Sequence, residues 1–140
     1  MKVLLKNVRL SFPSLFKTEQ YAGEDTEKYA ATFLISKSDT KTVASIEQAC
    51  KAALVEKYGE GKVPKGFKLP LVDGDDKEYQ GYADCVYIKA NTKKRPTLVN
   101  RDKTPIVEED GILYGGCYVN ASIDVWVMDN SYGKKVLASL

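Results

Sequence analysis

Alternation of apolar and polar residues predicts β-strands along most of the chain. It is clearest over residues 117–128, where odd positions are apolar and even positions from 118 to 126 are polar or aromatic. This period of two is typical of a strand with one face in the core and one facing water or a ligand. Residues 3–12 repeat it, with Val8, Leu10 and Phe12 expected on the core face. Further strand signals lie at residues 28–35, 78–90, 97–100 and 134–140.

Between the expected strands at residues 28–35 and 78–90, the apolar residues recur at the spacing of a helix. Ser38 and Asp39 are suitable N-cap residues, apolar residues then recur at helical intervals up to Leu54, and Gly59 follows the last turn. The spacing predicts a helix of roughly five turns. Strands with one inserted helix favour a mostly β fold, a small antiparallel barrel or sandwich, and we expect residues 1–140 to form a single domain.

The composition narrows the chemistry that the chain can perform. No histidine is present, which removes the commonest general base and every Ser-His or Cys-His arrangement. Cys50, Cys85 and Cys117 are far apart and are interpreted as reduced core thiols. We therefore expect no catalytic residues, no metal site and no cofactor.

A metal-dependent nuclease is one alternative function for this chain. Its acidic candidates are Asp73, Asp75, Asp76 and Asp84. Metal-assisted hydrolysis needs carboxylates that converge from different elements, whereas three of these four share one loop. A solvated acidic loop is the favoured interpretation.

The first residues, MKVLLKNVRL, contain an apolar run of only Val3 to Leu5 before a lysine interrupts it. This run is too short for a signal peptide, and no segment approaches the length of a membrane span. We expect an intracellular protein without membrane contact.

One segment concentrates positive charge in a chain whose net charge is only +2. Residues 89–105 carry six cations and one acid. Such a loop is either a solvated hairpin tip or a surface that neutralises phosphates and releases their counterions. The candidate phosphate contacts are Lys89, Lys93, Lys94, Arg95, Arg101 and Lys103.

The aromatic residues favour the second reading, because single-strand binders combine a basic groove with stacking platforms. The chain has nine tyrosines against four phenylalanines and one tryptophan. Tyr118 and Trp126 stand on the polar face of the 117–128 strand, and Tyr82 and Tyr114 lie beside glycines that permit close approach. These four are the candidate stacking residues.

Four segments together resemble tailed-bacteriophage single-stranded-DNA-binding proteins, distant structural relatives of the T-odd phage helix-destabilising protein. The segments are NVRLSFPSLF, KYAATFLISK, KRPTLVN and YGGCYVNASIDVW. The resemblance implies an OB-like barrel in the host cytoplasm that coats single-stranded DNA during phage replication and recombination. The family pattern has matching positions at Lys28, Tyr29, Arg95, Pro96, Tyr114, Gly115, Gly116 and Tyr118.

The resemblance also implies an acidic, flexible C-terminal tail that recruits phage or host replication proteins. Because the sequence ends at Leu140 within an expected strand and has no acidic run there, we expect that tail to be absent from this chain. Lys28 joins the candidate DNA contacts through this resemblance.

The sequence is compatible with more than one type of nucleic acid and with a second class of function. Single-stranded DNA is the expected partner, but the basic loop and stacking residues do not by themselves exclude duplex DNA or RNA. A phage structural or protein-interaction module, in which the aromatic face meets protein, is the alternative function.

Overall fold

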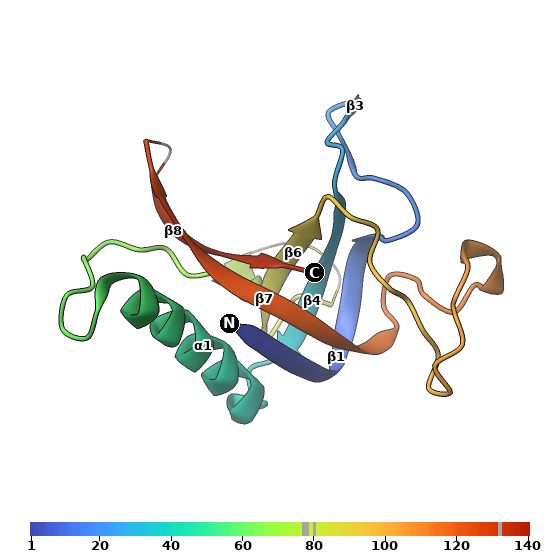
Figure 1. Ribbon diagram of the computed structural model, residues 1–140. Coiled ribbons are helices and arrows are strands. Elements are labelled where there is room, and N and C mark those ends of the chain that lie inside the picture. Colours follow the sequence, from blue (N-terminus) through green and yellow to red (C-terminus); the bar gives the residue numbers. More distant parts are fainter. Residues whose placement is uncertain (77–78, 80, 132) are drawn as a thin grey trace.

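The computed structural model describes residues 1–76, 79, 81–131 and 133–140. Within these residues, five strands close into a barrel in the order β1–β4–β6–β8–β7 and back to β1 (Figure 1). This confirms the mostly β, OB-like architecture with an inserted helix. The barrel strands are β1 (Lys2–Ser14), β4 (Tyr29–Ser36), β6 (Cys85–Thr92), β7 (Tyr118–Asn130) and β8 (Gly133–Ser139), and the other elements are β2 (Gln20–Tyr21), β3 (Glu24–Asp25), α1 (Thr40–Tyr58), β5 (Leu71–Asp73) and the 3₁₀ turns η1 (Gly74–Asp76) and η2 (Glu108–Asp110).

The barrel is antiparallel except at the seam where it closes. There β6 and β8 run parallel and share the registered pair Asn91–Ser139, supported by a hydrogen bond from the Leu140 N–H to the Asn91 carbonyl. Every other pairing around the ring is antiparallel. A five-stranded, partly open barrel of this kind is typical of the OB fold.

The inward faces of the strands build one apolar core, as the alternation predicts. On β7, Ile123 and Val125 are fully buried while Tyr118, Asp124 and Trp126 are exposed. The other large side chains that are fully buried are Leu5, Val8, Leu10, Ile35, Ile46, Cys50, Ile88 and Val136. Because this core draws on residues throughout the chain, the barrel strands depend on one another for stability.

Helix α1 contributes one apolar face to the same core, through Ile46, Cys50, Ala53 and Leu54, and it packs against β1 and β7. At its last residue, the Tyr58 hydroxyl donates a 2.6 Å hydrogen bond to the Asp129 carboxylate near the end of β7. This bond to a carboxylate raises the pKa of Tyr58 to about 12.

Strand β1 differs from the sequence prediction at Phe12. The register between β1 and β4 shifts between Ser11 and Ser14, and Phe12 has a positive φ of 44°. This bulge reverses the alternation, so Phe12 turns outward and is 59% exposed. The prediction that Phe12 faces the core is wrong.

Three other boundaries also differ from the predictions. Of the expected strand at 78–90, only β6 from Cys85 is a strand, and residues 78 and 80 lie outside the described residues. The expected strand at 97–100 is a single bridge between Val99 and Pro105. Strand β5 pairs with β6 within a stretch expected to be a loop. Helix and strand assignments depend here on partners distant in sequence, which local patterns do not reveal.

The helix start supplies a test of the local prediction. The Asp39 carboxylate accepts hydrogen bonds from the Thr42 N–H at 3.3 Å and from the Thr42 hydroxyl at 2.7 Å. We expect Asp39→Ala to lower the free energy of unfolding by about 1 kcal/mol, because the first turn loses its cap. Urea denaturation measures the change. Gln48→Ala, on the exposed face of the same helix, is the control and should stay within about 0.5 kcal/mol of the parent. Equal stabilities for the two variants would contradict the capping role.

Candidate nucleic-acid interface

The outward positions of four strands line up across the barrel surface. The β-sheet register places Arg9 beside Tyr118 on one side and beside Leu34 on the other, and Leu34 beside Tyr87. A second row joins Ser11, Thr32 and Lys89. Residues in register on one face are close neighbours, so these side chains form a continuous surface. We call this surface of β1, β4, β6 and the start of β7 the outer face.

Tyr79, Gly81 and Tyr82 lie over the middle of the outer face. The Tyr82 hydroxyl forms a 2.9 Å hydrogen bond with the Ser11 hydroxyl, and a Cβ added at Gly81 would lie 3.9 Å from Leu34 Cδ1. Tyr82 is only 3% exposed. The expectation that Tyr82 presents an exposed ring is therefore corrected, because neighbouring side chains cover that ring.

Tyr82 instead supports a cluster of aromatic rings. Its ring lies 5.3 Å from that of Tyr79 and 5.3 Å from that of Tyr87, and the Phe12 ring meets Tyr79 edge-on at 5.1 Å. Phe12 and Tyr79 are 59% and 54% exposed. These two exposed rings were missed in the sequence, Phe12 because its strand period assigned it to the core. Only the bulge in β1 reveals its direction.

Arg9 is a second residue that the sequence analysis missed. Its side chain is half-buried, and its Nε donates a 3.2 Å hydrogen bond to the Gly116 carbonyl. Glycines flank the guanidinium: a Cβ at Gly81 would lie 2.9 Å from Nη1, and one at Gly116 would lie 3.3 Å from Nη2. Its place on the polar side of a strand was the only sequence signal.

Several predicted cations gather at the opposite end of the β4–β6 pair. Tyr29 is in register with Thr92, so Lys28, one residue before, and Lys93, one residue after, lie at the same end. Lys89 lies three residues earlier on β6, where its ammonium is 3.0 Å from the Glu19 carboxylate. The fold thus brings Lys28 to the same end of the sheet as Lys89, Lys93 and Lys94, which follow it in the sequence by 61 or more positions.

Barrel closure also brings Trp126 toward this basic end. Its indole Nε1 donates a 2.9 Å hydrogen bond to the Ser139 hydroxyl, and Ser139 is in register with Asn91 on β6. The Trp126 side chain is 43% exposed. Tyr118, also exposed, lies eight residues away along β7, or roughly 26 Å at the usual rise of a strand. The two predicted stacking residues therefore belong to different ends of the barrel.

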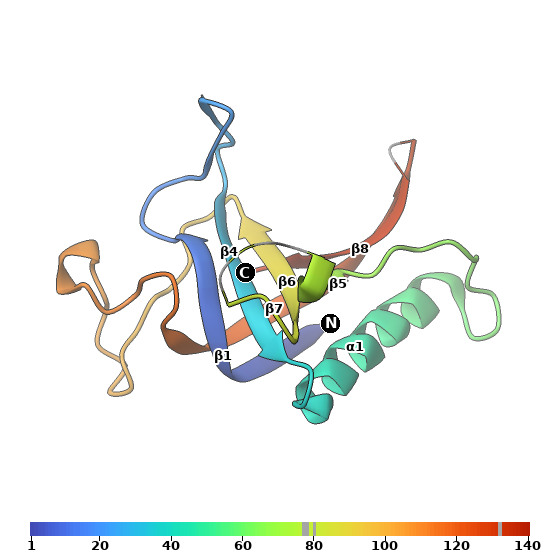
Figure 2. The same ribbon diagram turned by 180° about the vertical axis from the view of Figure 1, so that it is seen from behind.

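The remaining predicted cations lie on the connection between β6 and β7, which extends away from the barrel on the side opposite α1 (Figure 2). Residues 98–106 form a small hairpin, closed by a hydrogen bond from the Ile106 N–H to the Leu98 carbonyl. Arg101 and Lys103 are exposed at its tip, and Arg95 is exposed before it. Tyr114, 59% exposed, lies where this connection returns to β1. In the described part of the chain, none of these three cations forms an ion pair.

Two of the four acidic residues considered for a nuclease, Asp73 and Asp75, have structural partners for their carboxylates. The Lys37 ammonium lies 2.9 Å from the Asp73 carboxylate and 2.5 Å from that of Asp75. Asp75 also accepts a hydrogen bond from the Asp84 N–H. Hydrogen bonds from the Asp75 N–H and from Lys37 lower the pKa of Asp73, and those from Lys37 and the Asp84 N–H lower the pKa of Asp75. No group of three or more metal-ligating side chains occurs among the described residues, which do not include the side chain of Asp76.

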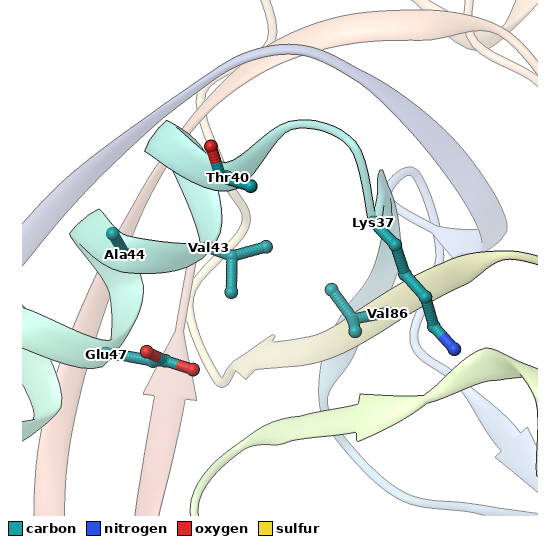
Figure 3. Close-up of a pocket in the computed structure, with 6 residues that line it drawn as sticks. All are labelled: Lys37, Thr40, Val43, Ala44, Glu47 and Val86. Carbon is teal, nitrogen blue, oxygen red and sulfur yellow. The ribbon is translucent and has the colours of Figure 1, made fainter.

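Two hollows mark the described surface. One, of about 310 Å³, is lined by Arg9, Tyr118, Gly81 and Asp39, among others. The other, of about 320 Å³, lies between α1 and β6, where Val43 and Val86 face each other and Lys37 points away (Figure 3). Only the first hollow includes a predicted site residue, Tyr118, so it is the one connected with the outer face.

The cysteines were expected to be core thiols; Cys50 is buried, whereas Cys85 and Cys117 are half-buried. All three are free. Burial is the main cause that raises the pKa of Cys50, to about 11, and that raises the pKa of Cys85. Because the thiolate is the reactive form, these shifts disfavour nucleophilic chemistry.

Among the described residues, no helix has the length and apolar character required to cross a membrane.

These features define the class as an OB-like barrel with cationic and aromatic side chains on its outer face. The whole chain, residues 1–140, matches the family model described as Enterobacter phage Enc34, ssDNA-binding protein, so the protein belongs to this family. The resemblance to phage single-stranded-DNA-binding proteins is confirmed.

Individual relatives agree with this assignment. Protein p50 of Acyrthosiphon pisum secondary endosymbiont phage 1 is 42% identical over 148 residues, which cover 100% of this chain and 80% of p50. The single-stranded DNA-binding protein from bacteriophage Enc34, solved in complex with ssDNA, superposes with a TM-score of 0.79 at 26% identity, covering 99% of this chain and 82% of that chain. The single-stranded DNA binding protein gp2.5 of bacteriophage T7 shares the fold, with a TM-score of 0.60 at 15% identity over 99% of this chain and 87% of gp2.5.

The Lys37 ion pairs generate a pH prediction. The pKa values of Asp73 and Asp75 are lower in the folded protein than in the unfolded chain, so their contribution to stability is present above about pH 4 and is lost as pH falls through the lowered values. We expect Lys37→Met to flatten the fall in Tm between about pH 6 and about pH 2.5. Lys41→Met, on the exposed surface of α1, is the control. A Tm profile for Lys37→Met parallel to that of the parent would exclude the ion pairs as the cause.

Proposed function

We propose that this protein binds single-stranded DNA without strong sequence preference, and coats and protects it during phage replication and recombination. The observation that carries the proposal is the composition of the outer face. Exposed aromatic rings, Phe12 and Tyr79, lie between Arg9 at one end and the lysines around Lys93 at the other. Membership of a family of ssDNA-binding proteins supports the same function.

The chemistry of the two kinds of side chain is complementary. Lysine and arginine neutralise phosphates and release counterions, which provides affinity for any sequence. Exposed rings stack on bases, with each stacked base contributing about 1–3 kcal/mol. Stacking requires bases that are unpaired and accessible, so the rings favour single strands over duplex.

The position of the surface agrees with the fold. In OB barrels, the face of the second and third strands is the usual oligonucleotide-binding surface. Here those barrel strands are β4 and β6. The cations at their Tyr29–Thr92 end lie at one end of that face, and Trp126 is joined to the same end across the seam through Ser139.

The proposed role in DNA binding involves no catalysed reaction. The protein acts on DNA by holding strands apart, as a single domain in the host cytoplasm. The partner is single-stranded DNA, and replication proteins of phage or host are partners only through a C-terminal tail of the kind that the family resemblance implies.

The first test is a titration with fluorescently labelled oligo-dT at several salt concentrations, with Trp126 emission followed in parallel. We expect log affinity to fall linearly with log salt, with a slope of about −0.7 for each phosphate neutralised. Quenching of Trp126 is also expected, because its ring is partly exposed beside the basic end. Absence of binding at low salt would overturn the proposal and favour a structural or protein-interaction module.

A charge variant tests the basic end separately. Lys93→Gln combined with Lys94→Gln should weaken binding to every sequence alike and make the salt slope shallower by about 1.4, because two cations are removed. The matched control is Lys51→Gln with Lys62→Gln, both exposed and on the α1 side of the molecule. Equal affinities and slopes for the two double variants would remove the Lys93 region from the binding surface.

A further inference from the structure

We infer that Arg9 and Tyr118 form one nucleotide-binding subsite, in which the guanidinium binds a phosphate of single-stranded DNA and the tyrosine ring stacks on an adjoining base. This inference rests on the proposed function and assigns a specific part of the surface to a specific part of the ligand. The sequence pattern identifies neither the pairing of Arg9 with Tyr118 nor the position of the phosphate.

The two side chains are adjacent on one surface. Arg9 on β1 and Tyr118 on β7 are directly in register, and residues opposite each other in an antiparallel pair have Cβ atoms about 4.5–5.5 Å apart. Tyr118 is 64% exposed, so its ring is available to a ligand. A phosphate and its neighbouring base can therefore meet both groups at once.

The guanidinium is held in position before any ligand arrives. Nε is bonded to the Gly116 carbonyl, and Gly81 and Gly116 leave space on its two sides that a Cβ would fill at 2.9 and 3.3 Å. A fixed arginine loses less conformational freedom on binding than a mobile surface lysine does. The Gly116 bond uses one of five N–H donors, which leaves others for an anion.

Arg9 also has no carboxylate counterion among the described residues. Asp39 lines the same hollow, but its two oxygens accept hydrogen bonds from Thr42 at the start of α1. A half-buried cation without an acidic partner is suited to an external anion, and phosphate binds arginine through paired N–H donors.

The space beside the pair is sufficient for a nucleotide-sized group. The hollow that Arg9 and Tyr118 line has a volume of about 310 Å³ and also contains Asn7 and Ser36. This volume lies at the lower end of the range for small-ligand sites. The subsite is separate from the basic end at Lys93, since it lies at the other end of β4.

The test compares Arg9→Gln with Lys6→Gln, an exposed cation on the same strand. With labelled oligo-dT, we expect Arg9→Gln to bind about tenfold more weakly and to have a salt slope shallower by about 0.7. Lys6→Gln should remain within about twofold of the parent, as expected for a surface change outside the site. An Arg9→Gln variant that matches Lys6→Gln in both quantities would overturn the subsite.

A double variant tests whether the two side chains serve the same nucleotide. Tyr118→Leu removes the stacking ring, and the combined Arg9→Gln, Tyr118→Leu protein should lose less affinity than the product of the two single losses, because one nucleotide is released by either change. Losses that multiply would show two independent contacts and contradict a single subsite.

A measurement on the unaltered protein avoids dependence on folding of the variants. Phenylglyoxal modifies guanidinium groups, and peptide mass spectrometry distinguishes Arg9, Arg95 and Arg101, the three arginines of the chain. We expect bound oligo-dT to protect Arg9. Modification of Arg9 at the same rate with and without DNA would overturn the subsite, while failure of the parent protein to bind oligo-dT would instead refute the proposed function.

Discussion

The double pairing of β1 is the constraint on which the rest of the structure depends. This strand is bonded to β4 along one edge and to β7 along the other, and it contains a register shift in each pairing. The shift between Leu5 and Val8 includes Asn7, whose N–H is bonded to the Asn120 side chain at 2.8 Å. The shift between Ser11 and Ser14 turns Phe12 outward. Bulges bend a strand and increase its twist, so the same two features that let β1 close the barrel also set which of its side chains reach the outer face.

The charge left on the surface depends on which partners the acidic side chains have. Lys37 pairs with Asp73 and Asp75, Asp39 caps α1, Asp102 accepts hydrogen bonds from Thr104 at the hairpin tip, and Asp129 binds Tyr58. These carboxylates act within the fold. Of the predicted cations, Lys89 has an acidic partner, Glu19, while the other cations of the basic segment form no ion pair within the described residues. A chain with a net charge of only +2 thus keeps, among its described residues, a segment whose cations other than Lys89 are not neutralised by ion pairs.

Family membership and side-chain geometry support different conclusions about this protein. Membership of the Enc34 ssDNA-binding protein family concerns the whole chain, whereas similarity to T7 gp2.5 at 15% identity concerns the fold alone. Neither assigns a role to a side chain. The roles proposed for Arg9, Phe12 and Lys93 rest on register, exposure and hydrogen bonding in this structure.

The sequence by itself determined the elements whose pattern is local. The period of two fixed the faces of β7, and the Asp39 cap with helical spacing located α1, because backbone geometry imposes both periodicities directly on neighbouring residues. Tertiary structure decided the rest. The bulge at Phe12 reversed one face, packing against Tyr79 and Tyr87 buried Tyr82, and register placed Lys28 near Lys93. Closure at Ser139 carried Trp126 to the basic end, and two glycines from distant segments enclosed Arg9. Each of these depends on which strands meet and in what alignment, and that alignment is set by long-range packing that no local pattern contains.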